Sequence, residues 1–165
     1  MSYRAAYYQL IDRLVKRITD FYGDRLVSLA VFGSVARDAF RPDSDIDILI
    51  VATDLPKGRI KRVREFESHI EIPFEEEIKS LFQQGIHPFL SPIIKTPEEV
   101  ALGSPLFLDM TEDVLIYFDR KDFLKNHLQK FSQRLQELGA KKVPAKGGYY
   151  WILKPDYQPG EVIEL

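Results

Sequence analysis

Two aspartates, Asp45 and Asp47, carry the clearest chemical signal in this sequence. They open an apolar run, and residues i and i+2 of a strand point to one face, about 6.6 Å apart. Two neighbouring carboxylates at the start of a buried strand are costly unless protons or a cation neutralise them. Hard divalent ions such as Mg²⁺ take oxygen ligands and keep positions open for substrate phosphates. The pair therefore predicts a site for a metal ion and a phosphate.

Gly33 and Ser34 supply the other half of this predicted site. They follow the apolar run 26–32, and Ser34 stands eleven positions before Asp45. A glycine after a strand lets the backbone approach a ligand closely, and a helix that starts there presents free N–H groups to an anion. The Ser34 hydroxyl adds a donor or a helix cap. We therefore expect both residues to contact phosphate.

Two arginines, Arg37 and Arg41, flank the same segment. A guanidinium group offers a fork of N–H donors that suits phosphate oxygens, so both are candidate nucleotide ligands. Each could equally neutralise Asp38, Asp43 or the metal-binding acids in the empty site, and the sequence leaves both roles open.

The order Gly33-Ser34, a spacer of about ten residues, then Asp45-Ile-Asp47 resembles the signature of the DNA polymerase β-like nucleotidyltransferase superfamily. The small chain resembles in particular the minimal nucleotidyltransferases of prokaryotes. The resemblance implies that an acceptor hydroxyl attacks the α-phosphorus of a nucleoside triphosphate and pyrophosphate leaves. It also implies that Gly33 and Ser34 hold the β- and γ-phosphates, and that Asp45 and Asp47 bind catalytic Mg²⁺ or Mn²⁺.

One part of the family pattern has no counterpart here. The third carboxylate normally lies on a later strand beside the first two, which we expect at 86–95, and this segment contains no Asp or Glu. Ser91 or His87 stands where that acid is expected. The nearest acids lie outside the strand: Glu71, Glu75, Glu76, Glu77, Glu98 and Glu99. Two hypotheses follow: an active transferase, or a catalytically weak relative that binds nucleotide or a protein partner.

The resemblance also bears on partners. Minimal nucleotidyltransferases resemble antitoxin-like components that work with a helical HEPN-domain protein, so such a partner is expected alongside the nucleoside triphosphate. The acceptor hydroxyl could belong to RNA, a protein or a small molecule, and the sequence does not decide between them. A glycosyltransferase that uses an Asp-x-Asp motif is a third hypothesis, but those folds are generally much longer than 165 residues.

Composition sets broader limits. A chain of 165 residues with 45% hydrophobic and 29% charged residues predicts one globular domain that spans 1–165. The net charge of −2 provides no overall field for nucleic acid, and the absence of cysteine excludes disulfides and thiol nucleophiles. No apolar run approaches the length that spans a membrane, and no apolar signal segment opens the chain, so we expect a cytoplasmic protein.

The periodicity of apolar residues predicts an α/β (α+β) fold, a mixed sheet with flanking helices in a nucleotidyltransferase-like arrangement. The segment 86–95 contains two prolines, which favours a strand at the edge of the sheet. The expected helices are 3–22, 57–84 with a kink at Pro73, 97–102 and 120–138 with Asp119 as its cap, and the expected strands are 26–32, 45–51, 86–95, 114–118 and 149–153.

Two further stretches keep alternative interpretations. A run of cations at 57–64 is typical of a solvated helix face, but it could also hold RNA or triphosphate. The aromatic residues 149–151 lie near the start of the C-terminal tail, which we expect to be extended from about residue 147. Its rings could stack on bases, pack in the core or form a contact between two copies of the chain. In a strand, Tyr150 faces away from Tyr149 and Trp151, so at most two of the rings share a surface.

Overall fold

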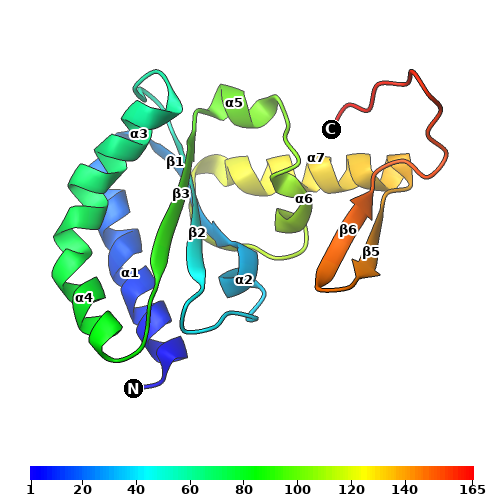
Figure 1. Cartoon of the computed structure of the whole chain (residues 1–165). Helices are drawn as coiled ribbons and strands as arrows, with labels where there is room; N and C mark the ends of the chain where they lie inside the picture. Colours follow the sequence, from blue (N-terminus) through cyan, green and yellow to red (C-terminus); the bar gives the residue numbers. More distant parts are fainter.

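A four-stranded mixed sheet forms the centre of the computed structural model, which describes residues 1–165 (Figure 1). The strand order is β3-β2-β1-β4. Only β2 and β3 run parallel, whereas β1 is antiparallel to both β2 and β4. The strands are β1 (Leu26–Phe32), β2 (Asp45–Ala52), β3 (Phe89–Lys95) and β4 (Leu115–Asp119). The predicted mixed sheet is confirmed, and 86–95 is its edge strand, although pairing begins only at Phe89.

Helices cover both faces of the sheet. One face packs against α1 and the irregular helix made by α3 and α4, and the other packs against α5, α6 and α7. The helices are α1 (Tyr3–Tyr22), α2 (Gly33–Ala36), α3 (Arg59–Phe66), α4 (Glu75–Gln83), α5 (Pro97–Ala101), α6 (Phe107–Met110) and α7 (Phe123–Leu138), with short 3₁₀ turns η1 (Gly23–Arg25) and η4 (Arg120–Asp122).

Strand β2 is apolar on both sides because both faces of the sheet are covered. Ile46, Ile48 and Ile50 are buried against α1 and the α3–α4 segment. Leu49 and Val51 alternate with them and are buried against the α5–α7 layer. This alternation also fixes where the two acids point, since Asp45 and Asp47 share the parity of Leu49 and Val51.

The segment from Arg59 to Gln83 forms one irregular rod, which we call the α3–α4 rod. A π-helical turn, η2 (Glu67–Glu71), and a 3₁₀ turn, η3 (Ile72–Phe74), join its two α-helices. Pro73 lies in that junction, as expected for a residue that cannot donate an amide hydrogen bond inside a helix. The predicted interruption at Pro73 is therefore confirmed.

Polar side chains cap two of the helices, and the predicted cap Asp119 is one of them. Thr96 and Glu99 form a reciprocal capping box at the start of α5. The two carboxylate oxygens of Asp119 accept from the amides of Leu124 (2.8 Å) and Lys125 (2.9 Å), and one of them also accepts from the buried Ser28 hydroxyl (2.7 Å).

The C-terminal region differs from the expectation. The strand at 149–153 is present as β6 (Gly148–Ile152), but it pairs with a second strand, β5 (Lys141–Ala145), that was not predicted. The resulting hairpin extends from the end of α7 and stands apart from the main sheet (Figure 1). The extended tail therefore begins after Ile152 rather than at about residue 147. No helix in the chain has the length and apolar character needed to cross a membrane.

Candidate active site

The two acids lie at one end of the central sheet, where three strands meet. Asp45 is the first residue of β2, and Asp47 is the third. Asp47 pairs with Phe32, the last residue of β1, and with Ser91 of β3. The site therefore has a rigid strand on either side and the short helix α2 directly after Phe32.

Gly33 contacts the Asp47 side chain. Its φ angle of +69° lies in the left-handed region that favours glycine. A Cβ atom at this position would overlap the Asp47 carboxylate. No side chain caps the start of α2, so the amides of its first turn remain available to an anion. Ser34 is the second residue of that turn, so the structure brings all four motif residues to one place.

The loop between α2 and β2 is anchored by aromatic residues of α1. The Tyr7 hydroxyl donates to the backbone carbonyl of Ser44 (2.7 Å), and the Tyr3 hydroxyl donates to that of Phe40 (3.1 Å). The Phe40 ring is buried, with its centroid 4.9 Å from that of Tyr7. We did not predict this positioning role from the sequence. Two features of the sequence could have indicated this role: Phe40 is a large apolar residue in a polar loop, and Tyr3 and Tyr7 stand one helical turn apart.

The Asp47 carboxylate carries uncompensated negative charge. Burial raises the pKa of Asp47, and the neighbouring Asp45 carboxylate raises it further. The Ser91 hydroxyl and the Arg37 guanidinium lower this pKa, but they do not offset the burial. A half-buried carboxylate without a full counter-charge is what a divalent cation would stabilise.

This charge predicts a pH-dependent stability. The pKa of Asp47 is raised in the folded state. The contribution of this side chain to the free energy of unfolding is therefore present at pH values below its unfolded-state pKa, and it is lost as pH rises through its folded-state pKa. The metal-free Asp47→Asn variant should therefore match wild type in acid and be the more stable protein at neutral pH. Thermal unfolding across this pH range checks the sign. Wild type that remained the more stable protein at neutral pH would contradict the assignment.

The two arginines differ in their surroundings. Arg41 forms an exposed ion pair with Asp43, with its Nε atom 3.2 Å from a carboxylate oxygen. This is one of the two roles left open by the sequence. Arg37 is close enough to lower the pKa of both Asp47 and Tyr149. It therefore lies on the side of the site that faces the β5–β6 hairpin.

The hairpin is held beside the site by polar contacts to α6 and the loop after it. The Trp151 indole donates to the Asp109 carboxylate (3.1 Å). The Lys142 ammonium pairs with Glu112 (2.7 Å) and lies 3.8 Å from the centre of the Tyr149 ring. Tyr149 and Trp151 thus share the inner face, and Tyr150 is half exposed on the other, as the strand alternation predicted.

No third acid completes the pair. Ser91 stands opposite Asp47 in β3, and no cluster of three Asp, Glu, His or Cys side chains that could hold a metal occurs in the structure. Four of the six acids considered from the sequence form ion pairs: Glu99 binds Arg62 (2.6 Å), Glu77 binds Arg13, and Glu75 and Glu76 bind Lys79. The prediction that β3 brings no carboxylate to the site is confirmed.

The nucleotidyltransferase domain family matches residues 11–96, just over half of the chain, and this range contains the glycine turn and both acids. The chain belongs to this family. The matched residues run from the middle of α1 to Thr96, directly before α5, whereas α7 and the hairpin lie outside them.

A putative protein adenylyltransferase from Methanocaldococcus jannaschii is 29% identical over 131 residues, which cover 78% of this chain and 83% of that protein. Among solved structures, a toxin-antitoxin complex with AMP-PNP contains a chain with 14% identity and a TM-score of 0.46, over 78% of this chain and 92% of that one. The toxin-antitoxin MntA-HepT contains a chain with 14% identity and a TM-score of 0.38, over 79% and 92%.

Proposed function

We propose that this nucleotidyltransferase domain transfers the nucleotide of a nucleoside triphosphate to a hydroxyl acceptor at the Asp45/Asp47 site. The observation that carries the proposal is the contact between Gly33 and Asp47, which places the start of α2 directly beside the acid pair. A triphosphate held by the amides at Gly33 and Ser34 would have its metal-binding oxygens next to both carboxylates. We further propose that residues 1–165 act as one domain, because α7 packs on the same sheet.

The donor set suits a hard divalent ion. Two carboxylates on one strand face supply oxygen ligands, and the raised pKa of Asp47 reflects charge that a cation would neutralise. We propose Mg²⁺ or Mn²⁺, which when bound supplies charge stabilisation for phosphoryl transfer. Gly33 and Ser34 would bind the phosphates, and Arg37, from the hairpin side, would pair with an oxygen that the metal leaves free. Arg41 would exchange its exposed partner Asp43 for phosphate.

For the acceptor we propose a protein hydroxyl, with ATP as the donor. This follows the name of the relative that matches most of both chains, a putative protein adenylyltransferase. A helical HEPN-type protein is our candidate partner, in line with the resemblance of the motif to minimal nucleotidyltransferases. RNA and small-molecule hydroxyls are the competing acceptors.

The test compares ATP labelled at the α-phosphate with ATP labelled at the γ-phosphate. The purified chain is incubated with Mg²⁺ or Mn²⁺, with and without a co-purifying helical protein or tRNA. We expect the α-label to enter a protein acceptor with release of pyrophosphate. Label that enters only RNA would change the acceptor, whereas γ-label incorporation would exclude nucleotide transfer. Without any partner we expect nucleotide binding but slow transfer.

The residue opposite Asp47 provides a direct test of the two-acid arrangement. Ser91→Asp should place a third carboxylate beside Asp47, because paired residues of neighbouring parallel strands project to the same face. With more oxygen ligands for metal, we expect transfer at limiting Mg²⁺ to rise about tenfold, which corresponds to about 1.4 kcal/mol of transition-state stabilisation. Ser91→Asn, of similar size but uncharged, is the control. Equal rates in these two variants would show that a third acid is not what limits transfer.

A further inference from the structure

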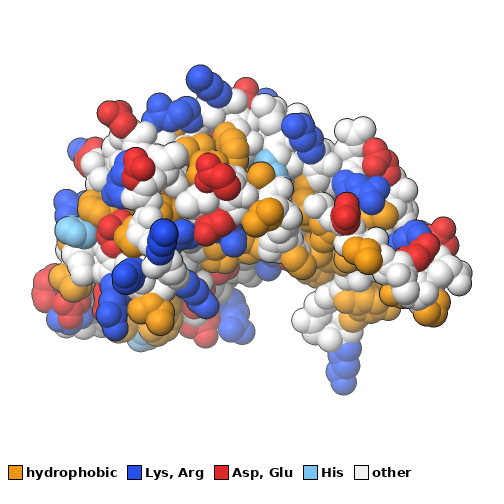
Figure 2. Space-filling model, turned by 90° about the horizontal axis from the view of Figure 1, so that it is seen from above, with side chains coloured by type: hydrophobic (Ala, Val, Ile, Leu, Met, Phe, Trp, Pro, Cys, Tyr) orange, Lys and Arg blue, Asp and Glu red, His pale blue; other side chains and the backbone are white.

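The α3–α4 rod carries opposite charges on its two halves. The start of the rod and the loop before it contain four cations without an ion pair: Lys57, Arg59, Lys61 and Arg64. Figure 2 shows Lys and Arg side chains gathered where α3 begins. The remainder of the rod, from Glu67 onward, carries Glu67, Glu71, Glu75 and Glu76, of which only Glu75 and Glu76 share a cation, Lys79. We call this part the acidic half. The rod from 59 to 83 is roughly 37 Å long at 1.5 Å per residue.

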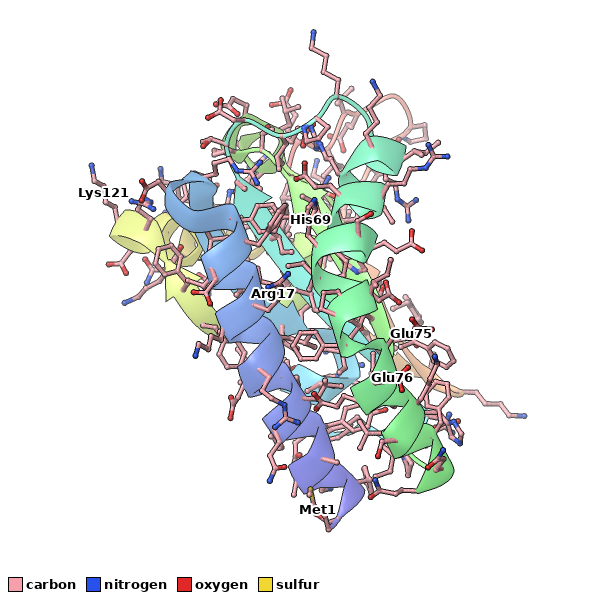
Figure 3. All side chains as sticks on the ribbon, turned by 90° about the vertical axis from the view of Figure 1, so that its left-hand side faces the viewer. Met1, Arg17, His69, Glu75, Glu76 and Lys121 are labelled. Carbon is pink, nitrogen blue, oxygen red and sulfur yellow. The ribbon has the colours of Figure 1, made fainter.

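One side of this rod is already covered. Arg17 of α1 donates to the backbone carbonyl of His69 (2.8 Å), and the His69 ring stacks on Phe21 at a centroid distance of 4.5 Å. Figure 3 shows Arg17 and His69 between α1 and the rod, and Glu75 and Glu76 on α4. The other side faces the edge strand β3. It is uncovered except at the start of α3, where Arg62 donates to the backbone carbonyl of Ile94 (3.2 Å) and pairs with Glu99 of α5 (2.6 Å).

This uncovered side is both hollowed and apolar. Around the acidic half, Glu67, Glu71, Glu75, Ile72 and Phe82 line a hollow of about 450 Å³. At the basic half, Arg59 and Lys95 line a second hollow of about 500 Å³, together with the Arg62–Glu99 ion pair. Ile72 (56% exposed) and Phe82 (36%) line the first hollow, and the Phe89 ring (57%) lies 6.0 Å from that of Phe82. Ile60 (68%) is exposed beside Arg59 at the start of α3. Exposed apolar residues with a charged rim are typical of protein interaction sites.

Glu67 and Glu71 lack a counter-charge within the chain. They stand one turn apart, and burial together with the Glu67 carboxylate raises the pKa of Glu71. Like charges at this spacing destabilise a helix. A cation supplied from outside the chain would therefore stabilise this turn.

We propose that the uncovered side of the α3–α4 rod binds the same side of a second copy of this chain, with the two rods antiparallel about a two-fold axis. In this arrangement each basic half faces the acidic half of the partner, and the contact occurs twice. A purely acidic or a purely basic partner would satisfy only one half of the rod, whereas a second copy satisfies both. The exposed apolar residues would form the centre of the contact.

Charge reversal tests the pairing. Wild type should have a solution mass of twice the 19.2 kDa chain, and the dimer should weaken as salt screens the charges. Arg59→Glu/Arg64→Glu and, separately, Glu71→Lys/Glu75→Lys should each raise the dimer dissociation constant roughly 100-fold, because like charges then oppose each other. An equimolar mixture of the two variants should restore a heterodimer, since every contact again joins opposite charges.

The matched control is Lys121→Glu/Lys125→Glu, which reverses two exposed cations near the start of α7. It should leave the dimer unchanged. Circular dichroism and thermal unfolding confirm that each variant is folded. A monomeric wild type at all concentrations, or a dimer that neither charge-reversed variant weakens, would overturn the proposal. Two weakened variants that fail to restore each other would also overturn it, because that result would show that the basic half of one rod does not face the acidic half of the other.

Discussion

The double variant Asp45→Asn/Asp47→Asn should no longer bind Mg²⁺–ATP. It should transfer nucleotide at least about 1,000-fold more slowly than wild type. Asparagine keeps the shape of each side chain but removes the negative charge that a divalent cation requires. Loss of several kcal/mol of metal-dependent stabilisation corresponds to a rate decrease of about three powers of ten. Calorimetric titration with Mg²⁺–ATP and the labelled transfer assay measure the two effects separately.

The matched control for this variant is Asp54→Asn. Asp54 is exposed beyond the far end of β2 and has a φ angle of +51°, which asparagine tolerates well. It should bind and transfer like wild type. Equal Mg²⁺–ATP affinity in wild type and the Asp45→Asn/Asp47→Asn protein would remove the basis for placing the metal between these carboxylates.

Gly33→Ala should also abolish nucleotide binding, although it leaves every charged group in place. A left-handed backbone costs a non-glycine residue about 1–2 kcal/mol, and the new methyl group would overlap the Asp47 carboxylate. Either the carboxylate or the start of α2 must then move, and both are needed at the phosphate. Thermal unfolding and Mg²⁺–ATP titration should report a loss of stability together with a loss of binding.

Gly139→Ala separates the backbone effect from the contact with Asp47. Gly139 ends α7 with the same φ angle of +69°, but the nearest atom to a Cβ there is a Pro155 carbon at an ordinary 3.8 Å. This variant should lose only the backbone contribution, about 1–2 kcal/mol of stability, and retain nucleotide binding. If both alanine variants bound nucleotide equally well, the close approach of Gly33 to the acid pair would have no functional role.

The central sheet and the site could be predicted from the sequence because their signals are local. The continuous apolar run of β2 is typical of a strand that is covered on both faces. Asp45 and Asp47 had to share a face whatever the strand pairing, because side chains alternate along a strand. The glycine before Ser34 indicated a close backbone approach to a ligand, which stays a prediction; the structure shows a close approach to the Asp47 carboxylate. The sequence left Ser91 or His87 for the position of the missing acid, and the structure places Ser91 opposite Asp47.

The hairpin and the anchoring of the site loop depend on contacts between distant segments, and this explains why they were missed. Strand β5 consists of Lys141-Lys-Val-Pro-Ala145, which contains a proline and two charged residues and has weak strand propensity on its own. It forms a strand by pairing with β6 across the turn at Gly147, where φ is +83°. Likewise, only the tertiary structure shows that Tyr3 and Tyr7 reach a loop more than thirty residues away.

The structure of the chain with Mg²⁺ and a non-hydrolysable ATP analogue tests the central claim most directly. We expect one metal ion about 2.0–2.1 Å from an oxygen of each of Asp45 and Asp47, with the β- and γ-phosphates against the amides of Gly33 and Ser34. A nucleotide bound elsewhere, for example in the hollow lined by Arg59 and Lys95, with no metal between the two aspartates, would contradict the account.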